Sequence, residues 1–434
     1  MKKRNVLLLV GLWAILNFIA CGGGGTKQPP SGLKERVLAS QGITDTVRFG
    51  GLVIINAFND TLPGIAPLSG GSNPGLMAVS PTRNIAAAFD ASSNSVFAVN
   101  TLKETSIGSA RLQGPTTSFV IPTSNPLGFA AVPSAVINGY SFVGAVDEMN
   151  LQDGVVVTIA VPNAQTVVSN SNGTQLLVFS NDSDSMTILN PGAASPPVDT
   201  SCLSTSNAPN AVCTIVPGFD RPVFAIINGN SAYILNCGAQ CGGNQASVAI
   251  FDLTTLTITS TINVDGATWA LLNNSTLYVA GTSPTNNACT GETTAATTCG
   301  RLDTVDLAAG KVTATAVITD GYHHRMDLTN NGQLFVGSYS CTNIGNVNNP
   351  SGEVRGCLSI VTVATNSVFI PPDNGNVNGL QGFSSRYVEY VAEGGNLRVY
   401  DTLHGDILLI NTYLPNGSIN IPGYVGDVKA IDFF

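Results

Sequence analysis

The chain has 434 residues, only 10% of them charged, and a formal net charge of −9. This acidic balance, with no basic patch along the chain, excludes the electrostatic footprint of a nucleic-acid-binding protein. Gly, Ser, Thr, Asn and Val are abundant, and they favour strands and tight turns over helices. We therefore expect an all-β protein with a large core.

Residues 1–20 have the anatomy of a signal peptide. Three basic residues, Lys2 to Arg4, precede an apolar run from Val6 to Ala20 that is too short to span a bilayer. A signal peptide directs export and is then removed, so we expect the mature protein outside the cytoplasm, where disulfides persist.

The apolar run ends at Ala20-Cys21, which resembles the lipobox of bacterial lipoproteins. In that motif a small residue precedes a cysteine that is lipidated and becomes the new N-terminus. The resemblance implies a membrane anchor at Cys21 and a tether over residues 21–34, which is glycine-rich and flexible. Gly22 after the cysteine favours the outer membrane or cell surface. Phe18 stands where Leu is usual, and an ordinary signal peptide with a chance cysteine is the alternative.

Residues 35–434 contain a repeated unit. In Gly75–Asn100, and again in Gln165–Asn190, three strands alternate with polar turns, and a short fourth strand follows. Four strands per unit are typical of the blades of a β-propeller. Related copies begin at Phe224, Trp269, Met326 and Phe383, with a weaker one at Phe119.

Seven complete units can be counted, and the two ends of the chain supply an eighth. With strands labelled A to D from the axis outward, residues 35–69 provide strands B to D, and Val425–Phe434 provides strand A. Their pairing would close the ring and remove a free edge. We predict an all-β, eight-bladed propeller over residues 35–434, closed by the C-terminal strand. Seven blades is one alternative, because Thr116–Val161 is irregular, and two separate β-sandwiches is the other.

Two segments carry a family resemblance. SPTRN with AAAFDASSNSVFAVN, and SNGTQLLVFSNDSDSMTILN, resemble the YVTN repeat, S-P-D-G-x-x-hydrophobic-Y-V-x-N followed by S-x-S-V-x-V-I-D. In degenerate form the resemblance covers nearly all of residues 35–434. It implies a surface-layer or lactonase-like propeller, and it bears on the fold far more than on function.

Apart from Cys21, the eight cysteines form four neighbouring pairs, each around a polar loop. Local disulfides are the simplest pairing for an exported protein. Metal binding is the alternative, but histidines are scarce and no CxxC occurs. The ring that a disulfide between Cys237 and Cys241 would close is short, and its geometry is demanding. The predicted pairs are Cys202 with Cys213, Cys237 with Cys241, Cys289 with Cys299, and Cys341 with Cys357.

Strand alternation places several polar and aromatic residues near one mouth of the channel. This is the mouth where D-to-A and B-to-C connections lie, and three of the four cysteine pairs bracket B-to-C loops there. The cluster could bind an anion or serve acid/base chemistry, or it could simply fill a polar channel. The candidate binding residues are Arg221, Trp269, His323, His324 and Arg325.

No catalytic residue, metal site or cofactor is assigned. The acidic doublets Asp147/Glu148 and Asp182/Asp184 lack the glycine and distal glutamate of an EF-hand loop. No nucleophile elbow, phosphate-binding loop or dinucleotide fingerprint is present.

The sequence therefore favours an envelope-anchored binding or scaffold module. We expect a monomer with a protein or glycan partner in the envelope, bound on the mouth that carries the cysteine loops. The alternative is a lactonase-like hydrolase with its site at the channel mouth. A redox propeller is a third interpretation, but this chain lacks the tryptophan-rich repeats of such proteins, since it has only two Trp.

Overall fold

The structure is a computed structural model that describes residues 29–434, except 138–139, 143, 181, 204–210, 295, 343, 346–353, 372–374, 403–416 and 434. The predicted signal peptide and Cys21 lie outside the described residues. Within them, no helix is long and apolar enough to cross a membrane.

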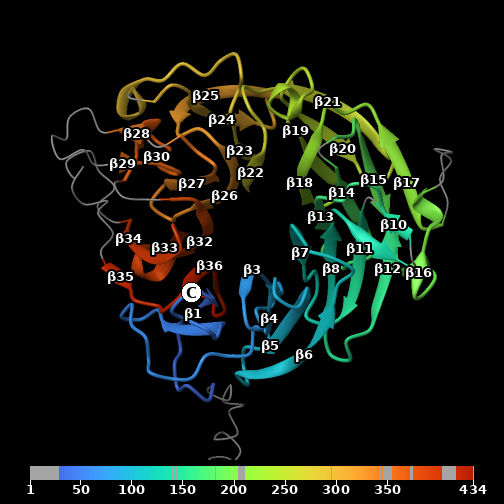
Figure 1. Cartoon of the computed structure of the whole chain (residues 1–434). Coiled ribbons are helices and arrows are strands. Elements are labelled where there is room, and N and C mark those ends of the chain that lie inside the picture. Colours follow the sequence, from blue (N-terminus) through green and yellow to red (C-terminus); the bar gives the residue numbers. More distant parts are fainter. Residues whose placement is uncertain are drawn as a thin grey trace, which may run out of the picture.

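The strands form eight blades that are arranged in a ring about a central axis (Figure 1). Six blades are four-stranded antiparallel sheets in sequence order. They are blade 1, β3 (Pro74–Val79), β4 (Ile85–Asp90), β5 (Ser95–Asn100) and β6 (Thr105–Arg111); blade 3, β13 (Thr166–Ser169), β14 (Leu176–Phe179), β15 (Ser185–Leu189) and β17 (Cys213–Pro217); blade 4, β18 (Pro222–Asn228), β19 (Ser231–Asn236), β20 (Ser247–Asp252) and β21 (Thr257–Asn263); blade 5, β22 (Trp269–Asn273), β23 (Thr276–Gly281), β24 (Gly300–Asp306) and β25 (Lys311–Ile318); blade 6, β26 (Tyr322–Leu328), β27 (Gln333–Tyr339), β30 (Leu358–Thr362) and β31 (Ser367–Phe369); and blade 7, β32 (Val377–Phe383), β33 (Val388–Glu393), β34 (Asn396–Asp401) and β35 (Gly417–Ile419).

Blade 2 is the irregular one, as the sequence indicated. Its inner strand is short, and a fifth strand from the following blade adds in parallel at its outer edge. A small hairpin, β9 (Ala135–Ile137) and β10 (Tyr140–Phe142), extends its B-to-C connection. The strands of the sheet are β7 (Ser118–Val120), β8 (Leu127–Val132), β11 (Ala145–Asn150), β12 (Val156–Ala160) and β16 (Val198–Asp199).

Blade 8 joins the two ends of the chain. The inner strand β36 (Tyr424–Ala430) pairs with β1 (Arg36–Gly42), which pairs with β2 (Gly51–Asn56). Leu68 bridges Leu52 where a fourth strand would lie. The eight-bladed propeller closed by its C-terminal strand is therefore confirmed.

Each sheet is packed between two neighbours, so both of its faces are buried. In β1, Val37 and Ala39 pack with Phe383 of blade 7, whereas Leu38 packs with Met77 of blade 1. Strands buried on both faces read as nearly continuous apolar runs. This explains sequences such as IAAAFD in β4, in which every residue is buried.

Buried aspartates tie the linkers between blades to the sheets. Asp147 of β11 accepts hydrogen bonds from the backbone N–H of Gln113 at 2.9 Å and the hydroxyl of Thr158 at 2.7 Å. Asp303 of β24 accepts the N–H of Asp265 at 2.7 Å in the same way. Burial raises the pKa of Asp147 to about 6. Asp147, one of the acidic residues weighed as a calcium ligand, is therefore a structural link between blades 1 and 2.

The connections divide between two faces of the ring. We call the face with D-to-A and B-to-C connections the upper face, and that with A-to-B and C-to-D connections the lower face. The upper face carries 3-10 helices η3 (Gly238–Cys241) and η4 (Gly291–Thr293) and the hairpin β28 (Ile344–Gly345) and β29 (Val354–Arg355). The lower face carries η1 (Pro191–Ala193), η2 (Ser201–Leu203) and η5 (Ser384–Arg386).

All four predicted disulfides are present. Three of them close B-to-C loops of blades 4, 5 and 6 on the upper face, and the fourth closes the C-to-D loop of blade 3 on the lower face. Disulfides indicate a location outside the cytoplasm. The bonds join Cys237 to Cys241, Cys289 to Cys299, Cys341 to Cys357, and Cys202 to Cys213.

Candidate ligand-binding site in the channel

The channel contains a cavity of about 600 Å³. Inner strands from all eight blades border it, so its wall is assembled from segments far apart in the sequence. One lining residue from each blade, in order, is Leu76, Ser118, Thr166, Phe224, Trp269, His324, Leu380 and Lys429.

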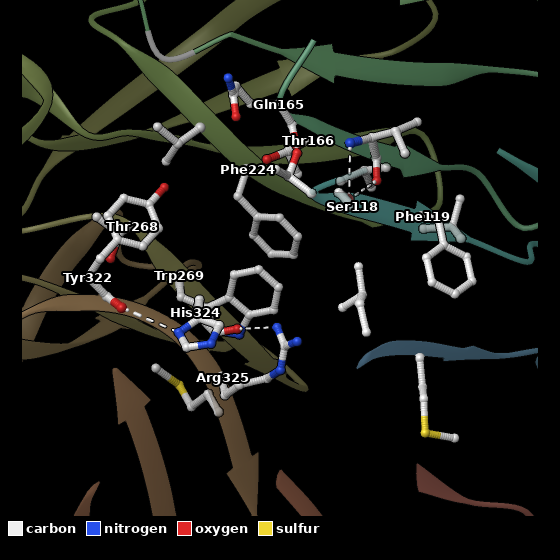
Figure 2. A pocket seen from close by; sticks show the side chains of 18 of the residues that line it. Ser118, Phe119, Gln165, Thr166, Phe224, Thr268, Trp269, Tyr322, His324 and Arg325 are labelled. Carbon is white, nitrogen blue, oxygen red and sulfur yellow. Dashed lines mark hydrogen bonds between the residues drawn. The ribbon is translucent and has the colours of Figure 1, made fainter. Parts of the chain in front are cut away.

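Aromatic side chains form the wall on the side of blades 4 to 6 (Figure 2). Phe224 of β18 stacks on Trp269 of β22, with ring centroids 4.0 Å apart. Tyr322 stacks on Tyr339 at 5.2 Å, and His324 meets Tyr339 edge-on at 4.7 Å. None of these five rings is fully buried. Aromatic surface left open in a concave site is well suited to binding an apolar or planar ligand.

A β-bulge in β26 brings two consecutive side chains into the channel. The register shifts between His323 and Arg325, which breaks the strict alternation of the strand. His324 and Arg325 therefore both line the cavity. Burial, with the Arg325 guanidinium beside it, holds the pKa of His324 well below its usual range, so its imidazole is neutral.

Two cations lie together on the wall, with one buried carboxylate behind them. Arg325 donates from Nε to the carbonyl of Asn378 and from Nη1 to that of His324, each at 2.8 Å. The Lys429 ammonium lies 3.0 Å from Asp427, and Arg325 Nη2 lies 3.9 Å from the same carboxylate. Asp427 is fully buried and also accepts the N–H of Met77. The side chains of Arg325 and Lys429 reach the cavity, whereas Asp427 does not line it.

The opposite wall is neutral. Blades 2 and 3 supply Ser118, Gln165 and Thr166 (Figure 2). Val120 and Val167 of the same blades also line the cavity. Among the described residues that line the cavity, none is an aspartate or glutamate. The channel therefore pairs an aromatic, cationic side with a neutral polar side.

The structure brings three of the five predicted binding residues to the cavity, namely Trp269, His324 and Arg325. Arg221 lies outside it. This residue has a positive φ of 57° in the turn before β18, and its Nε lies 3.6 Å from a carboxylate oxygen of Asp184 in blade 3. His323 is also outside the cavity. It is fully buried, and its Nε2 donates to the carbonyl of Thr319 at 2.9 Å.

Four of the aromatic or charged lining residues were not among the residues predicted from the sequence, namely Phe224, Tyr322, Tyr339 and Lys429. Phe224 begins a repeat copy just as Trp269 does, so its position carried a usable signal. Lys429 and Asp427 are charged residues two positions apart in the otherwise apolar closing strand, so they lie on the same side of it. This pattern could also have been recognised in the sequence. Tyr322 and Tyr339 could not be found this way, because their contact depends on the strand ends of blade 6.

A smaller cavity of about 260 Å³ lies at the lower end of the channel. Asp327 of β26 lines it and accepts the N–H of Gly382 at 2.7 Å. Glu389 is fully buried nearby, and neither of its carboxyl oxygens has a hydrogen-bond partner among the described residues. Burial, with Asp327 adding to it, raises the pKa of Glu389 well above its usual range. These two carboxyl groups lie at the lower end, away from the aromatic wall.

The neutral, buried His323 predicts a loss of stability in acid. Burial lowers the pKa of His323 to about 4, whereas an unfolded histidine titrates near 6.5. The unfolded chain therefore binds the proton first, and stability falls as the pH drops from about 6.5 towards 4, by about 3 kcal/mol in all. His323→Gln removes this titration. We expect its free energy of unfolding, measured in urea, to fall less steeply than that of the wild type over this interval, and parallel curves would contradict the assignment.

Comparisons with known proteins identify the fold. No family model matches the chain, and no curated protein matches it at a significant level. The YVTN resemblance thus gains no support from a family match. Among solved structures, the chain is similar to other propellers: Kuenenia stuttgartiensis hydrazine synthase (13% identity, 74% of this chain and 94% of that chain, TM-score 0.51), dihydro-heme d1 dehydrogenase NirN in complex with DHE (12%, 92% and 75%, 0.57) and the Dos1 propeller (10%, 82% and 85%, 0.52). At these identities the likeness shows the fold alone.

Proposed function

We propose that this protein is an exported, lipid-anchored binding module that holds a small organic anion in its channel. The observation that carries the proposal is the partly exposed aromatic wall in a cavity of about 600 Å³. That volume is in the range of ligand pockets, which combine apolar surface with a few placed polar groups. Open aromatic rings are costly inside a channel unless something covers them.

The charges of the wall favour an anion. His324 is neutral, and Asp427 offsets one of the two cations, Arg325 and Lys429, which leaves one positive charge in excess. Nη2 of Arg325 makes no hydrogen bond within the described part of the chain, and its contact with Asp427 is too long for one. These donors are available to a carboxylate or a similar anionic group. A ligand with a planar apolar body and one negative charge would satisfy both parts of the wall.

Calorimetric titration with 2-naphthoate tests this proposal, with the neutral 2-naphthalenemethanol as the matched probe. We expect the anion to bind more tightly than the alcohol. Arg325→Gln should weaken naphthoate binding by about 10- to 100-fold, because a charged hydrogen bond is lost. Trp269→Ala should weaken both probes. Arg221→Gln, on the same face but outside the cavity, is the control and should bind as the wild type does. Absence of naphthoate binding, or binding that neither cavity variant reduces, would contradict the proposal.

The lipid anchor has its own test. Cys21 follows the apolar run, and Cys21→Ser removes the sulfur that would carry the lipid. We expect this variant to be unprocessed or released from membranes, whereas the wild type incorporates labelled fatty acid and fractionates with membranes. The other eight cysteines are in disulfides, so Cys202→Ser with Cys213→Ser is a control that should remain lipidated. Membrane retention of the Cys21→Ser variant with normal processing would refute the anchor.

The stapled loops of the upper face support a second, larger contact. Loops held in one shape lose less entropy on binding. We therefore propose in addition that this chain is a monomer that binds a protein or glycan partner in the envelope through the upper face. The lactonase-like alternative is less well supported, because no carboxylate among the described residues faces the cavity to pair with His324. Within those residues, no cluster of side chains suited to a metal ion occurs either.

A further inference from the structure

The exposed apolar side chains of the lower face lie on consecutive blades. Phe58, Leu102 and Val155 occupy the C-to-D turns of blades 8, 1 and 2, and their exposed fractions are 70%, 57% and 57%. We call these three residues the apolar tips. Phe433 follows β36 on blade 8, is exposed by 67% and lines the smaller cavity at the lower end of the channel.

Among the described C-to-D connections, large apolar side chains are exposed only in this sector. In blades 4, 5 and 6 the same turns present small or polar residues, Thr254-Thr255, Ala308-Ala309 and Ala364-Thr365. The repeat itself therefore does not require a large apolar residue at this position. Exposed apolar side chains on the same face of three consecutive blades are suited to contact with an extended apolar partner.

The start of the described chain lies in the same sector. Ser31 donates from its backbone N–H and from its hydroxyl to Glu104, each at 2.6 Å, and Glu104 is in the C-to-D turn of blade 1 next to Leu102. Glu104 also pairs with the buried Arg36 at 2.8 Å. The N-terminal segment is thus fixed to the middle of the three blades that carry the apolar tips.

Covalent geometry limits how far this point can be from the lipid. Pro29 is eight positions after Cys21 in the chain, and a fully extended chain of that length spans about 28 Å at most. An anchor at Cys21 therefore holds Pro29, close to the attachment point at Glu104 on the lower face of blade 1, within about 28 Å of the bilayer. Two exposed lysines, Lys34 and Lys103, flank the tips and suit the interfacial region of a membrane.

We propose that the lower face of blades 8, 1 and 2 docks on the lipid bilayer through the apolar tips, so that the upper mouth of the channel faces away from the membrane. This inference rests on the lipid anchor of the proposed function. It adds an orientation: the ligand cavity and the three stapled loops point outward, where soluble ligands and partners arrive, and the smaller cavity lies on the membrane side.

Depth-dependent quenching of tryptophan tests the orientation. Trp269 is the single tryptophan of the mature chain, since Trp13 lies in the predicted signal peptide. In a Trp269→Phe background, Phe58→Trp or Leu102→Trp places a reporter on the lower face. Phe49→Trp is the matched control, because Phe49 is 84% exposed in the B-to-C connection of blade 8 on the upper face. Each lipidated protein is bound to vesicles of brominated phosphatidylcholine.

We expect strong quenching at positions 58 and 102 and none at position 49. Naphthoate should bind the wild type equally well on vesicles and in detergent, because the upper mouth stays open. Quenching at position 49 that equals or exceeds that at 58, in protein that sediments with vesicles, would overturn the orientation and leave the anchor intact. A wild-type protein that does not sediment with vesicles would overturn the anchor and this inference together.

Discussion

Deletion of Gly426–Phe434 should leave a protein that aggregates or unfolds far below the temperature of the full chain. The deletion removes most of β36, the inner strand of blade 8, including Asp427 to Ala430, which pair with Val37 to Ser40 of β1. The deletion also removes the buried side chains of Val428, Ala430 and Ile431. Each buried aliphatic side chain contributes about 1.5–3 kcal/mol, so the total loss is on the order of the whole stability of a typical domain.

The reason lies in the topology as well as in the buried area. Without β36, the edge of β1 is open to the channel and can pair with another chain. Thermal unfolding followed by circular dichroism, with light scattering in parallel, measures both consequences. Removal of only Phe433 and Phe434 is the control, since Phe433 is largely exposed and this truncation keeps β36 whole. A long truncation that melts like the short one would refute closure by the C-terminal strand.

Much of the fold could be read from the sequence because blades repeat. The strand and turn pattern of Gly75–Asn100 recurs often enough to count blades, and each copy supports the others. The closing strand was predictable for a different reason. Residues 35–69 lack an inner strand and Val425–Phe434 lacks outer ones, so the ring is complete only if they join, as β36 and β1 do. The disulfide pairing followed from the same repeat, since each pair brackets one loop.

The channel site was less accessible to such reasoning. Strand alternation predicts which mouth a residue approaches, and Trp269, His324 and Arg325, predicted near one mouth, line the cavity. It could not foresee the bulge in β26, which turns His323 into the interior. Nor could it foresee the left-handed turn at Arg221. Such local departures from regular geometry depend on packing between blades, and a single strand read alone does not reveal them.

The ion pairs that join the two ends of the chain likewise could not be predicted from the sequence. Arg36 lies in β1 within an apolar strand, and its guanidinium is buried. It donates to Asp432 from Nε at 2.9 Å and from Nη2 at 2.7 Å, and from Nη1 to Glu104 at 2.8 Å and the carbonyl of Thr101 at 2.7 Å. One side chain thus connects the N-terminal strand, the C-terminus and blade 1. These four hydrogen bonds need the planar fork of a guanidinium, and lysine, with three donors on one nitrogen, could not supply them.

We therefore expect Arg36→Ala to lower the free energy of unfolding by about 3–5 kcal/mol, because it leaves Glu104 and Asp432 without the charge that compensates their burial. Urea unfolding measures the loss, and Lys34→Ala, an exposed cation two residues earlier, should stay within about 0.5 kcal/mol of the wild type. Combining Arg36→Met with Glu104→Gln and Asp432→Asn should recover part of the stability, since no uncompensated charge then remains. The loss in Arg36→Ala should also change little with salt, because the pairs are shielded from solvent. A loss below about 1 kcal/mol, the range of surface ion pairs, would show that this buried cluster does not hold the ring closed.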